Sequence, residues 1–241
     1  MMEHVNLRKL VYSSGSIVFF GGAGTSTESG IPDFRSAGGL YEQRTSKVYE
    51  PEEILSRDFF HAHPADFYSF YRTHMVYPQA RPNPAHLKLA DLEQEGRLKA
   101  VITQNIDGLH QLAGSVNVLE LHGSVHRNRC LDCGISHPLS AVIGDSRPVP
   151  LCGECGGIIK PDVVLYQENL DFDLLERAAV HIQQADTLIV AGTSLTVQPA
   201  AGLVGLFRGD NLVLINRDAT PMDGYATHLI RGSIGEVMAA L

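Results

Sequence analysis

Four short apolar runs limit the folds open to this chain more than any other feature of its sequence. The runs are partly β-branched and cover residues 16–20, 98–103, 186–192 and 211–216. Continuous apolar runs of this length are typical of strands that are buried on both faces, as in a parallel sheet. Segments with helical spacing lie at residues 85–96 and 173–185. This alternation of strand and helix predicts an α/β fold with a doubly wound parallel sheet.

Composition places further limits on function. The chain has 241 residues and is 44% hydrophobic, so it can bury a full core as one large domain or as one domain with an insertion. Its 19 basic and 27 acidic side chains give a net charge of −8, which disfavours non-specific nucleic-acid binding. The N-terminus has no signal-peptide pattern, and no apolar run approaches the roughly 18 residues of a membrane span. We therefore expect a soluble, cytoplasmic protein with no membrane partner and no direct nucleic-acid partner.

All four cysteines fall into two Cys-x2-Cys pairs. They are Cys130, Cys133, Cys152 and Cys155. This spacing is typical of a tetrahedral zinc site with four thiolate ligands, because each pair offers two sulfurs from one tight turn. Two disulfides or four buried thiols are the alternatives, and a cytoplasmic location disfavours the disulfides. Four protein ligands leave no open coordination position, so the pattern predicts a structural zinc and not a catalytic one.

Two segments interrupt the strand–helix alternation. Residues 36–80 are rich in aromatic side chains and in Pro, Ser and His, and we expect helices near 51–57 and 64–76. The second segment, residues 123–165, holds the cysteine pairs. The predicted architecture is a Rossmann-like α/β domain with a smaller domain made of a zinc ribbon and a helical insertion. The expected limits are residues 1–35, 81–122 and 166–241 for the α/β domain, and 36–80 and 123–165 for the smaller one.

Small or hydrogen-bonding residues follow each of the four predicted strands. These strand ends read Gly21-Gly22-Ala23-Gly24, Gln104-Asn105-Ile106-Asp107, Gly192-Thr193-Ser194 and Asn216-Arg217-Asp218. Ligands of open α/β sheets bind beyond the carboxyl ends of the strands. Loops are usually polar, so a single strand end of this kind would be weak evidence for a binding site. Four of them together favour a nucleotide site in a single crevice.

The glycine-rich loop after the first strand is a poor dinucleotide fingerprint. Thr27 replaces the third glycine of the G-x-G-x-x-G pattern, and Gly30-Ile31-Pro32 stops the helix that should follow. The acidic residue that a dehydrogenase places about 20 residues further on has no clear counterpart. Both departures disfavour an ordinary oxidoreductase.

The motifs, taken in order, resemble those of sirtuins, the NAD-dependent protein deacylases. They are GAGTSTESGIPDFRSAGGLY, TQNIDGLHQLAG, ELHGS, the paired Cys-x2-Cys, GTSLTVQPAA and LVLINRDATP, and the resemblance runs from about residue 7 to residue 241. It implies NAD and zinc as cofactors, and acetyl-lysine proteins or peptides as partners. The implied reaction is protein-lysine deacetylation that yields nicotinamide, O-acetyl-ADP-ribose and the free lysine.

The resemblance also implies a set of NAD contacts. Ala23, Gly24 and Thr27 would pack against the pyrophosphate, while a loop over the nicotinamide side would carry Asp33, Phe34 and Arg35. Phe34 would shield the reacting ribose carbon from water, and Arg35 would order the loop and the phosphates. The remaining expected contacts of the cofactor are Gln104, Asn105, Ile106, Asp107, His122, Gly192, Thr193, Ser194, Asn216, Arg217 and Ile234.

Two of these residues are expected to be catalytic. His122, in the ELHGS motif, would be the general base that takes a proton from a ribose hydroxyl, since a histidine titrates near neutrality. Asn105 would contact the ribose hydroxyls or the water near them, while Asp107 and the Ile106 backbone hold the carboxamide. His86 and His110 also match the family pattern, and we expect packing roles for them.

The chain departs from the family pattern at several positions. Tyr166-Gln167-Glu168 stands where Phe-Gly-Glu is frequent, and Thr25 stands where Ile is usual. Sirtuins that prefer succinyl or malonyl groups carry a Tyr-x-x-Arg pair, which here becomes Tyr68 and Tyr71. Arg72 follows one residue later, and we expect it to turn away from the Tyr68 face. These features predict a preference for acetyl groups over acidic ones.

Two other functions remain open from the sequence. An enzyme that transfers ADP-ribose to protein, or hydrolyses NAD, could use the same pocket. A zinc-ribbon binding module would explain the cysteines, but it would explain neither the four strand ends nor the acidic charge balance. Release of nicotinamide that depends on an acyl-lysine peptide would distinguish deacylation from both.

Overall fold

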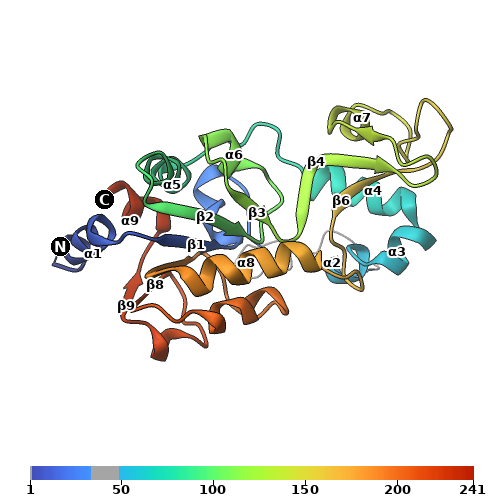
Figure 1. The fold of residues 1–241 in the computed structure, drawn as a ribbon. Coiled ribbons are helices and arrows are strands. Elements are labelled where there is room, and N and C mark those ends of the chain that lie inside the picture. Colours follow the sequence, from blue (N-terminus) through green and yellow to red (C-terminus); the bar gives the residue numbers. More distant parts are fainter. Residues whose placement is uncertain (1, 34–48) are drawn as a thin grey trace.

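A six-stranded parallel sheet forms the larger part of the computed structural model, which describes residues 2–33 and 49–241 (Figure 1). The strands lie in the order β3-β2-β1-β7-β8-β9, and every neighbouring pair is parallel. Their bounds are β1 Ile17–Gly21, β2 Leu98–Thr103, β3 Val118–Glu120, β7 Thr187–Ala191, β8 Asn211–Asn216 and β9 His228–Arg231. The α/β prediction is confirmed, and the four apolar runs are the four central strands. The chain order reverses between β1 and β7, which places a topological switch point there.

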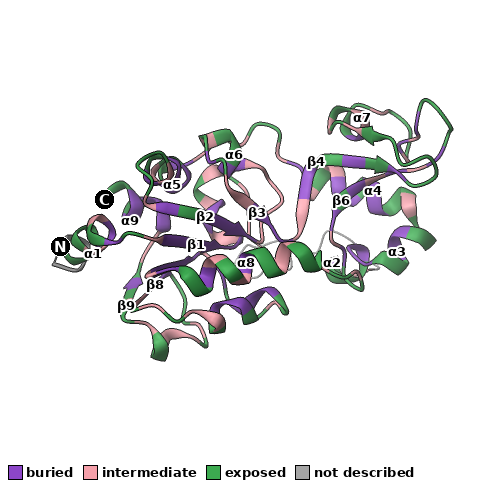
Figure 2. Cartoon of the chain, in the orientation of Figure 1, coloured by how far each residue is buried: buried purple, intermediate pink, exposed green. Residues whose placement is uncertain are grey.

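Alternate residues of the central strands feed two apolar cores, one on each face of the sheet. Phe19 belongs to the core on one face, and Phe20 belongs to the core on the other. The first face is covered by α1 (Met2–Ser13), α5 (Pro84–Gln94) and α9 (Ile234–Ala239), and the second by α8 (Phe172–Gln184) and the 3-10 helix η3 (Ala200–Leu206). Figure 2 shows the buried strands and the exposed outer side of α8. A doubly wound sheet results.

The expected helices around residues 85–96 and 173–185 are present with small shifts. The first, α5, begins one residue earlier because Asn83 caps it and Pro84 occupies its first turn. The second, α8, is capped by Asp171, whose side chain accepts a hydrogen bond from the Leu174 N–H. Gly96 follows α5 with a φ of +73°, the left-handed conformation that glycine adopts freely.

A second, antiparallel sheet of three strands lies beside the larger one (Figure 1). Its strands are β4 Gly123–Cys130, β5 Ser136–His137 and β6 Ile159–Val163, in the order β5-β4-β6. The helices packed with it are α2 Pro51–Ile54, α3 Arg57–Ala62, α4 Pro64–His74 and α7 Ser140–Ile143. One apolar core joins Phe60 and Phe67 from the helices to Ile159 and Cys130 from the strands. The cysteine-bearing segment and the helical insertion therefore share a single core.

No helix of residues 2–33 or 49–241 has both the length and the apolar character needed to cross a membrane.

Candidate active site

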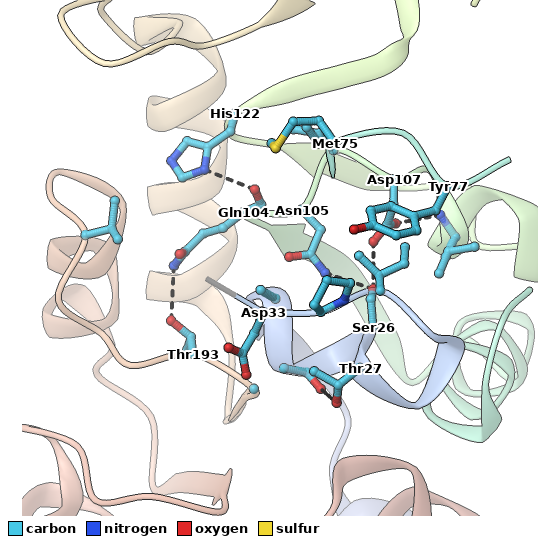
Figure 3. Close-up of a pocket in the computed structure, with 18 of the residues that line it drawn as sticks. Ser26, Thr27, Asp33, Met75, Tyr77, Gln104, Asn105, Asp107, His122 and Thr193 are labelled. Carbon is cyan, nitrogen blue, oxygen red and sulfur yellow. Dashed lines mark hydrogen bonds between the residues drawn. The ribbon is translucent and has the colours of Figure 1, made fainter. Parts of the chain in front are cut away.

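A cavity of about 810 Å³ opens beyond the carboxyl ends of the central strands, between the two sheets. All four strand ends singled out in the sequence contribute to its wall, and side chains of the smaller sheet and its helices complete it. Every residue predicted to contact the cofactor lines this cavity, as far as the structure describes them. Phe34 and Arg35 lie outside the described residues. Figure 3 shows part of this wall, with Thr27, Asp33, Asn105 and His122 directed around one space.

Glycines let the loops after β1 and β7 touch each other. The Gly24 N–H donates to the Gly192 carbonyl over 2.8 Å, and a Cβ on Gly24 would lie 2.7 Å from the Gly192 Cα. Two short 3-10 helices follow, η1 (Ala23–Thr25) and η2 (Thr27–Ser29), and Gly30 ends them with a φ of +84°. Within residues 22–33 no long helix forms, as expected, and Ile31, Pro32 and Asp33 line the cavity instead.

His122 follows β3 and lines the cavity (Figure 3). Its Nδ1 lies 3.0 Å from the Gln104 carbonyl oxygen. A carbonyl only accepts, so Nδ1 carries the hydrogen and Nε2 keeps its lone pair. Burial lowers the pKa of His122, and the bond to Gln104 opposes that shift only in part. The ring is therefore held in the neutral tautomer that a general base requires.

Ser26 joins the glycine-rich loop to the loop after β2. Its hydroxyl donates to the Asp107 carboxylate over 2.6 Å and accepts from the Asn105 side-chain amide over 3.1 Å (Figure 3). The other Asp107 oxygen accepts from the Leu109 N–H. Burial raises the pKa of Asp107. Sequence reasoning missed Ser26, because nothing local links residues 81 positions apart.

Two other side chains of the cavity wall form hydrogen bonds with backbone groups of neighbouring segments. The Asn216 side-chain amide accepts from the Thr193 N–H and donates to the Thr193 carbonyl, over 3.2 and 2.9 Å. It therefore fixes the loop after β7 as well as lining the cavity. Glu28, a second residue that the sequence did not single out, accepts from the Gly235 N–H and the Ser233 hydroxyl at the start of α9. This contact places Ile234 at the cavity wall.

His86 and His110 are buried behind the site, with ring centroids 4.7 Å apart. His86 Nδ1 accepts from the Asn83 N–H. Burial lowers the pKa of His86 to about 4, and it also lowers the pKa of His110. Both rings stay neutral and pack in the core, as expected.

The four cysteines form one cluster. Their sulfur atoms all lie within 4.8 Å of one another, with Cys130 Sγ 3.4 Å from Cys155 Sγ and Cys133 Sγ 3.8 Å from Cys152 Sγ. A tetrahedral zinc with Zn–S bonds of about 2.3 Å needs sulfurs roughly 3.8 Å apart. The residues therefore fit a zinc ion held between the turn after β4 and the turn before β6.

Tyr68 and Tyr71, both on α4, are fully buried, and Tyr71 lines the cavity. The Tyr68 hydroxyl donates to the Ile159 carbonyl over 2.5 Å. The expectation that Arg72 turns away from Tyr68 was wrong, since its guanidinium carbon lies 5.6 Å from the Tyr68 ring centroid. Residues four apart share a helix face, and this was overlooked. Arg72 donates to the Val142 and Arg147 carbonyls and does not line the cavity.

Thr25 and Gln167, which depart from the family pattern, lie in different environments. Thr25 is fully buried, and its carbonyl accepts from the Asn83 side chain, so it packs behind the cavity wall. Gln167 lines the cavity and has a φ of +73°, a left-handed conformation that favours the glycine frequent at this position in the family. Its side-chain oxygen accepts from the Asp58 N–H over 3.1 Å. This bond ties the segment after β6 to α3.

Comparisons with known proteins agree with this geometry. A sequence model described as the Sir2 family matches residues 22–199. An NAD-dependent protein deacetylase of Clostridium acetobutylicum is 55% identical over 239 residues, covering 99% of this chain and 98% of the relative. One of the same name from Cutibacterium acnes is 56% identical over 240 residues, covering 100% of this chain and 98% of the relative.

Solved structures show the same similarity. A Sir2 variant with a deacetylated p53 peptide and 3′-O-acetyl ADP ribose has a TM-score of 0.91 and 40% identity, covering 99% of this chain and 97% of that one. A Sir2–p53 peptide–NAD+ complex has a TM-score of 0.84 and 41% identity, covering 97% and 94%.

Proposed function

The chain belongs to the Sir2 family, and we propose that it is an NAD-dependent protein-lysine deacetylase that produces nicotinamide, O-acetyl-ADP-ribose and free lysine. Relatives of that name match nearly the whole chain at 53–56% identity. One observation of the site carries the proposal. His122 lines the nucleotide-sized cavity with Nδ1 bonded to the Gln104 carbonyl, so Nε2 is the nitrogen left to take a proton.

The residues of this chain divide the work of the reaction. When bound, NAD would supply an electrophilic ribose carbon for the acetyl oxygen, with nicotinamide as the leaving group. Asp107, held by Ser26, orients the carboxamide, and Asn105 meets the ribose hydroxyls from the same loop. The loops after β1, β7 and β8, which line the cavity, would hold the phosphates and the adenosine half. His122 accepts a proton from a ribose hydroxyl once nicotinamide has gone.

A single assay separates this function from its alternatives. Nicotinamide release from NAD is measured with an acetyl-lysine peptide, with the same peptide carrying free lysine, and without peptide. Release that requires the acetylated peptide supports deacetylation. Release without peptide would indicate NAD hydrolysis or ADP-ribosyl transfer, and no release at all would indicate a binding module.

The pH profile of the reaction should reflect the burial of His122. Burial lowers the pKa of His122, so the neutral base persists to a lower pH than an ordinary histidine with a pKa near 6.5. We expect the acid limb of kcat/KM to have its midpoint below pH 6.5, since this ratio reports the free enzyme. Initial rates between pH 5 and pH 8 test this expectation. A midpoint at or above pH 6.5 would contradict it.

The acyl preference is expected to favour acetyl strongly over succinyl. Tyr71 occupies the cavity wall where acidic-acyl enzymes place an arginine, and burial raises the pKa of its hydroxyl, as it would for any acid there. A succinyl carboxylate would be buried without a cation, at a cost of several kcal/mol. We predict kcat/KM for an acetyl peptide at least about 100-fold above that for the succinyl peptide of the same sequence.

Two variants sharpen this comparison. Tyr71→Arg adds a cation three residues from Tyr68 and should raise desuccinylation while lowering deacetylation. Tyr71→Phe keeps the ring without the charge and should leave the preference unchanged. Comparable kcat/KM values for both peptides in the unaltered protein would contradict the predicted preference, because Arg72 donates to the Val142 and Arg147 carbonyls and does not line the cavity.

We also propose the two-domain division stated above, with limits near residues 35, 80, 122 and 165. Two apolar cores flank the larger sheet and a third belongs to the smaller one, which supports this division. A cytoplasmic location is proposed as well. The four cysteines form no disulfide and are grouped for a metal, as suits a reducing compartment.

A further inference from the structure

The carboxamide loop, defined here as residues 104–108, is bonded to the segment that starts at the catalytic histidine. Three of its carbonyls accept hydrogen bonds from that segment. Gln104 accepts from His122 Nδ1 over 3.0 Å, and the Ile106 carbonyl accepts from the Val125 N–H over 3.0 Å. The third bond joins His126 to Asp107. His122 and the first part of β4 therefore hold the loop along its length.

The third of these bonds is donated by His126, an exposed side chain that was not among the site residues predicted from the sequence. His126 Nε2 lies 3.0 Å from the Asp107 carbonyl oxygen, and because a carbonyl only accepts, Nε2 is the donor. The ring also covers Gly108, where an added Cβ would lie 2.6 Å from His126 Cδ2. Gly108 has a φ of +73°, so the chain reverses under the ring just after Asp107. His126 lines the same cavity.

The strand that carries His126 is itself anchored on both sides. Arg127 donates to the buried Glu120 carboxylate over 2.5 Å and to Asp162 over 3.1 Å. Glu120 ends β3 of the larger sheet, and Asp162 belongs to β6 of the smaller one. The backbone of His126 is therefore fixed, so its ring can restrain the position of the carboxamide loop.

We propose that His126 is a positioning residue of the nicotinamide pocket. It holds the Asp107–Gly108 backbone so that the Asp107 carboxylate stays directed at the carboxamide while Ser26 and Leu109 bond its oxygens. The inference rests on the proposed function, because it takes nicotinamide to be the group that Asp107 meets. Within residues 2–33 and 49–241, the hydrogen bond of the His126 side chain goes to the carboxamide loop, so we expect His126 to act on the nicotinamide half of the cofactor and not on the adenosine half.

The test compares inhibition by nicotinamide with binding of ADP-ribose, which lacks nicotinamide, in the full zinc-loaded chain. His126→Ala should raise the nicotinamide inhibition constant and the KM for NAD by about three- to tenfold, the range of one hydrogen bond. The dissociation constant of ADP-ribose, from calorimetry, should change less than about twofold. His126→Gln, whose Nε2 can still donate, should restore most of the loss, and His126→Leu, which only fills space, should not. His61→Ala, an exposed histidine on α3, is the matched control.

Three results would overturn the inference. They are an unchanged inhibition constant in His126→Ala, an equal weakening of ADP-ribose binding, and a His126→Leu variant that behaves like the unaltered protein. Failure of the proposed function looks different, because the unaltered protein would then release no nicotinamide with the acetyl peptide. In that case the dissociation constants of NAD and ADP-ribose are compared directly. His126→Ala must weaken NAD alone, or the inference is wrong.

Discussion

Replacing His122 with alanine should lower kcat for deacetylation by about 10²-fold or more, the usual effect of removing a general base. The affinity for NAD should change much less, because the base acts after the cofactor has bound. Among the described residues the His122 side chain makes one hydrogen bond, to the Gln104 carbonyl, so we expect its removal to leave the rest of the cavity wall in place. Steady-state kinetics with an acetyl-lysine peptide, together with calorimetric NAD binding, measure both quantities.

His122→Asn is the matched variant for this experiment. Its side-chain amide can still donate to the Gln104 carbonyl, but it cannot accept a proton at neutral pH. It should therefore be as slow as His122→Ala while keeping the local structure. Near-normal deacetylation by either variant would assign the base to another residue.

Removing the metal should disrupt the smaller sheet and abolish activity. Cys130 and Cys152 are buried in the same core as Tyr68 and Phe67, so the zinc site and the helical insertion depend on each other. A structural zinc contributes about 10 kcal/mol or more to folding. We expect one zinc per chain, and a large fall in melting temperature and activity for Cys130→Ala or after chelation. Metal analysis, thermal denaturation and the deacetylation assay measure these effects.

Ser136→Ala changes an exposed residue of β5 close to the cluster and serves as the control. It should keep its zinc, its melting temperature and its activity. A protein that contains no zinc, or that stays fully active after chelation, would refute the structural role of the cysteines.

The central strands could be predicted from the sequence, whereas the edge strands could not. The β1, β2, β7 and β8 strands are buried almost completely, so their sequences are continuously apolar. The strands at the two edges, β3 and β9, have only three and four residues; β3 ends in the charged Glu120, and β9 is exposed at two of its four positions. Segments this short, with charged or exposed positions, carry no apolar run by which to recognise them.

Part of the cavity wall could be predicted from the motifs, but the contacts between its residues could not. Motif resemblance pointed to Asp107 and Asn216, since both follow strands that end at the same edge. Ser26 and His126 were missed because their hydrogen bonds join segments far apart in the chain. Arg72 was misplaced by a helical-wheel argument that ignored the contact between residues four apart.

The shared core of the smaller sheet limits how this protein can be recombined with its relatives. That core takes residues from α2, α3 and α4, which lie between β1 and β2 in the chain. It also takes residues from β4 and β6, which lie between β3 and β7. A chimaera that exchanged only the cysteine-bearing segment would set foreign strands against the native Phe60, Phe67 and Tyr71. The wall proposed to receive the acyl group would then combine residues from two different parent proteins. Transfer of acyl specificity between relatives therefore has to move residues 51–76 and 123–165 together, as one discontinuous cassette.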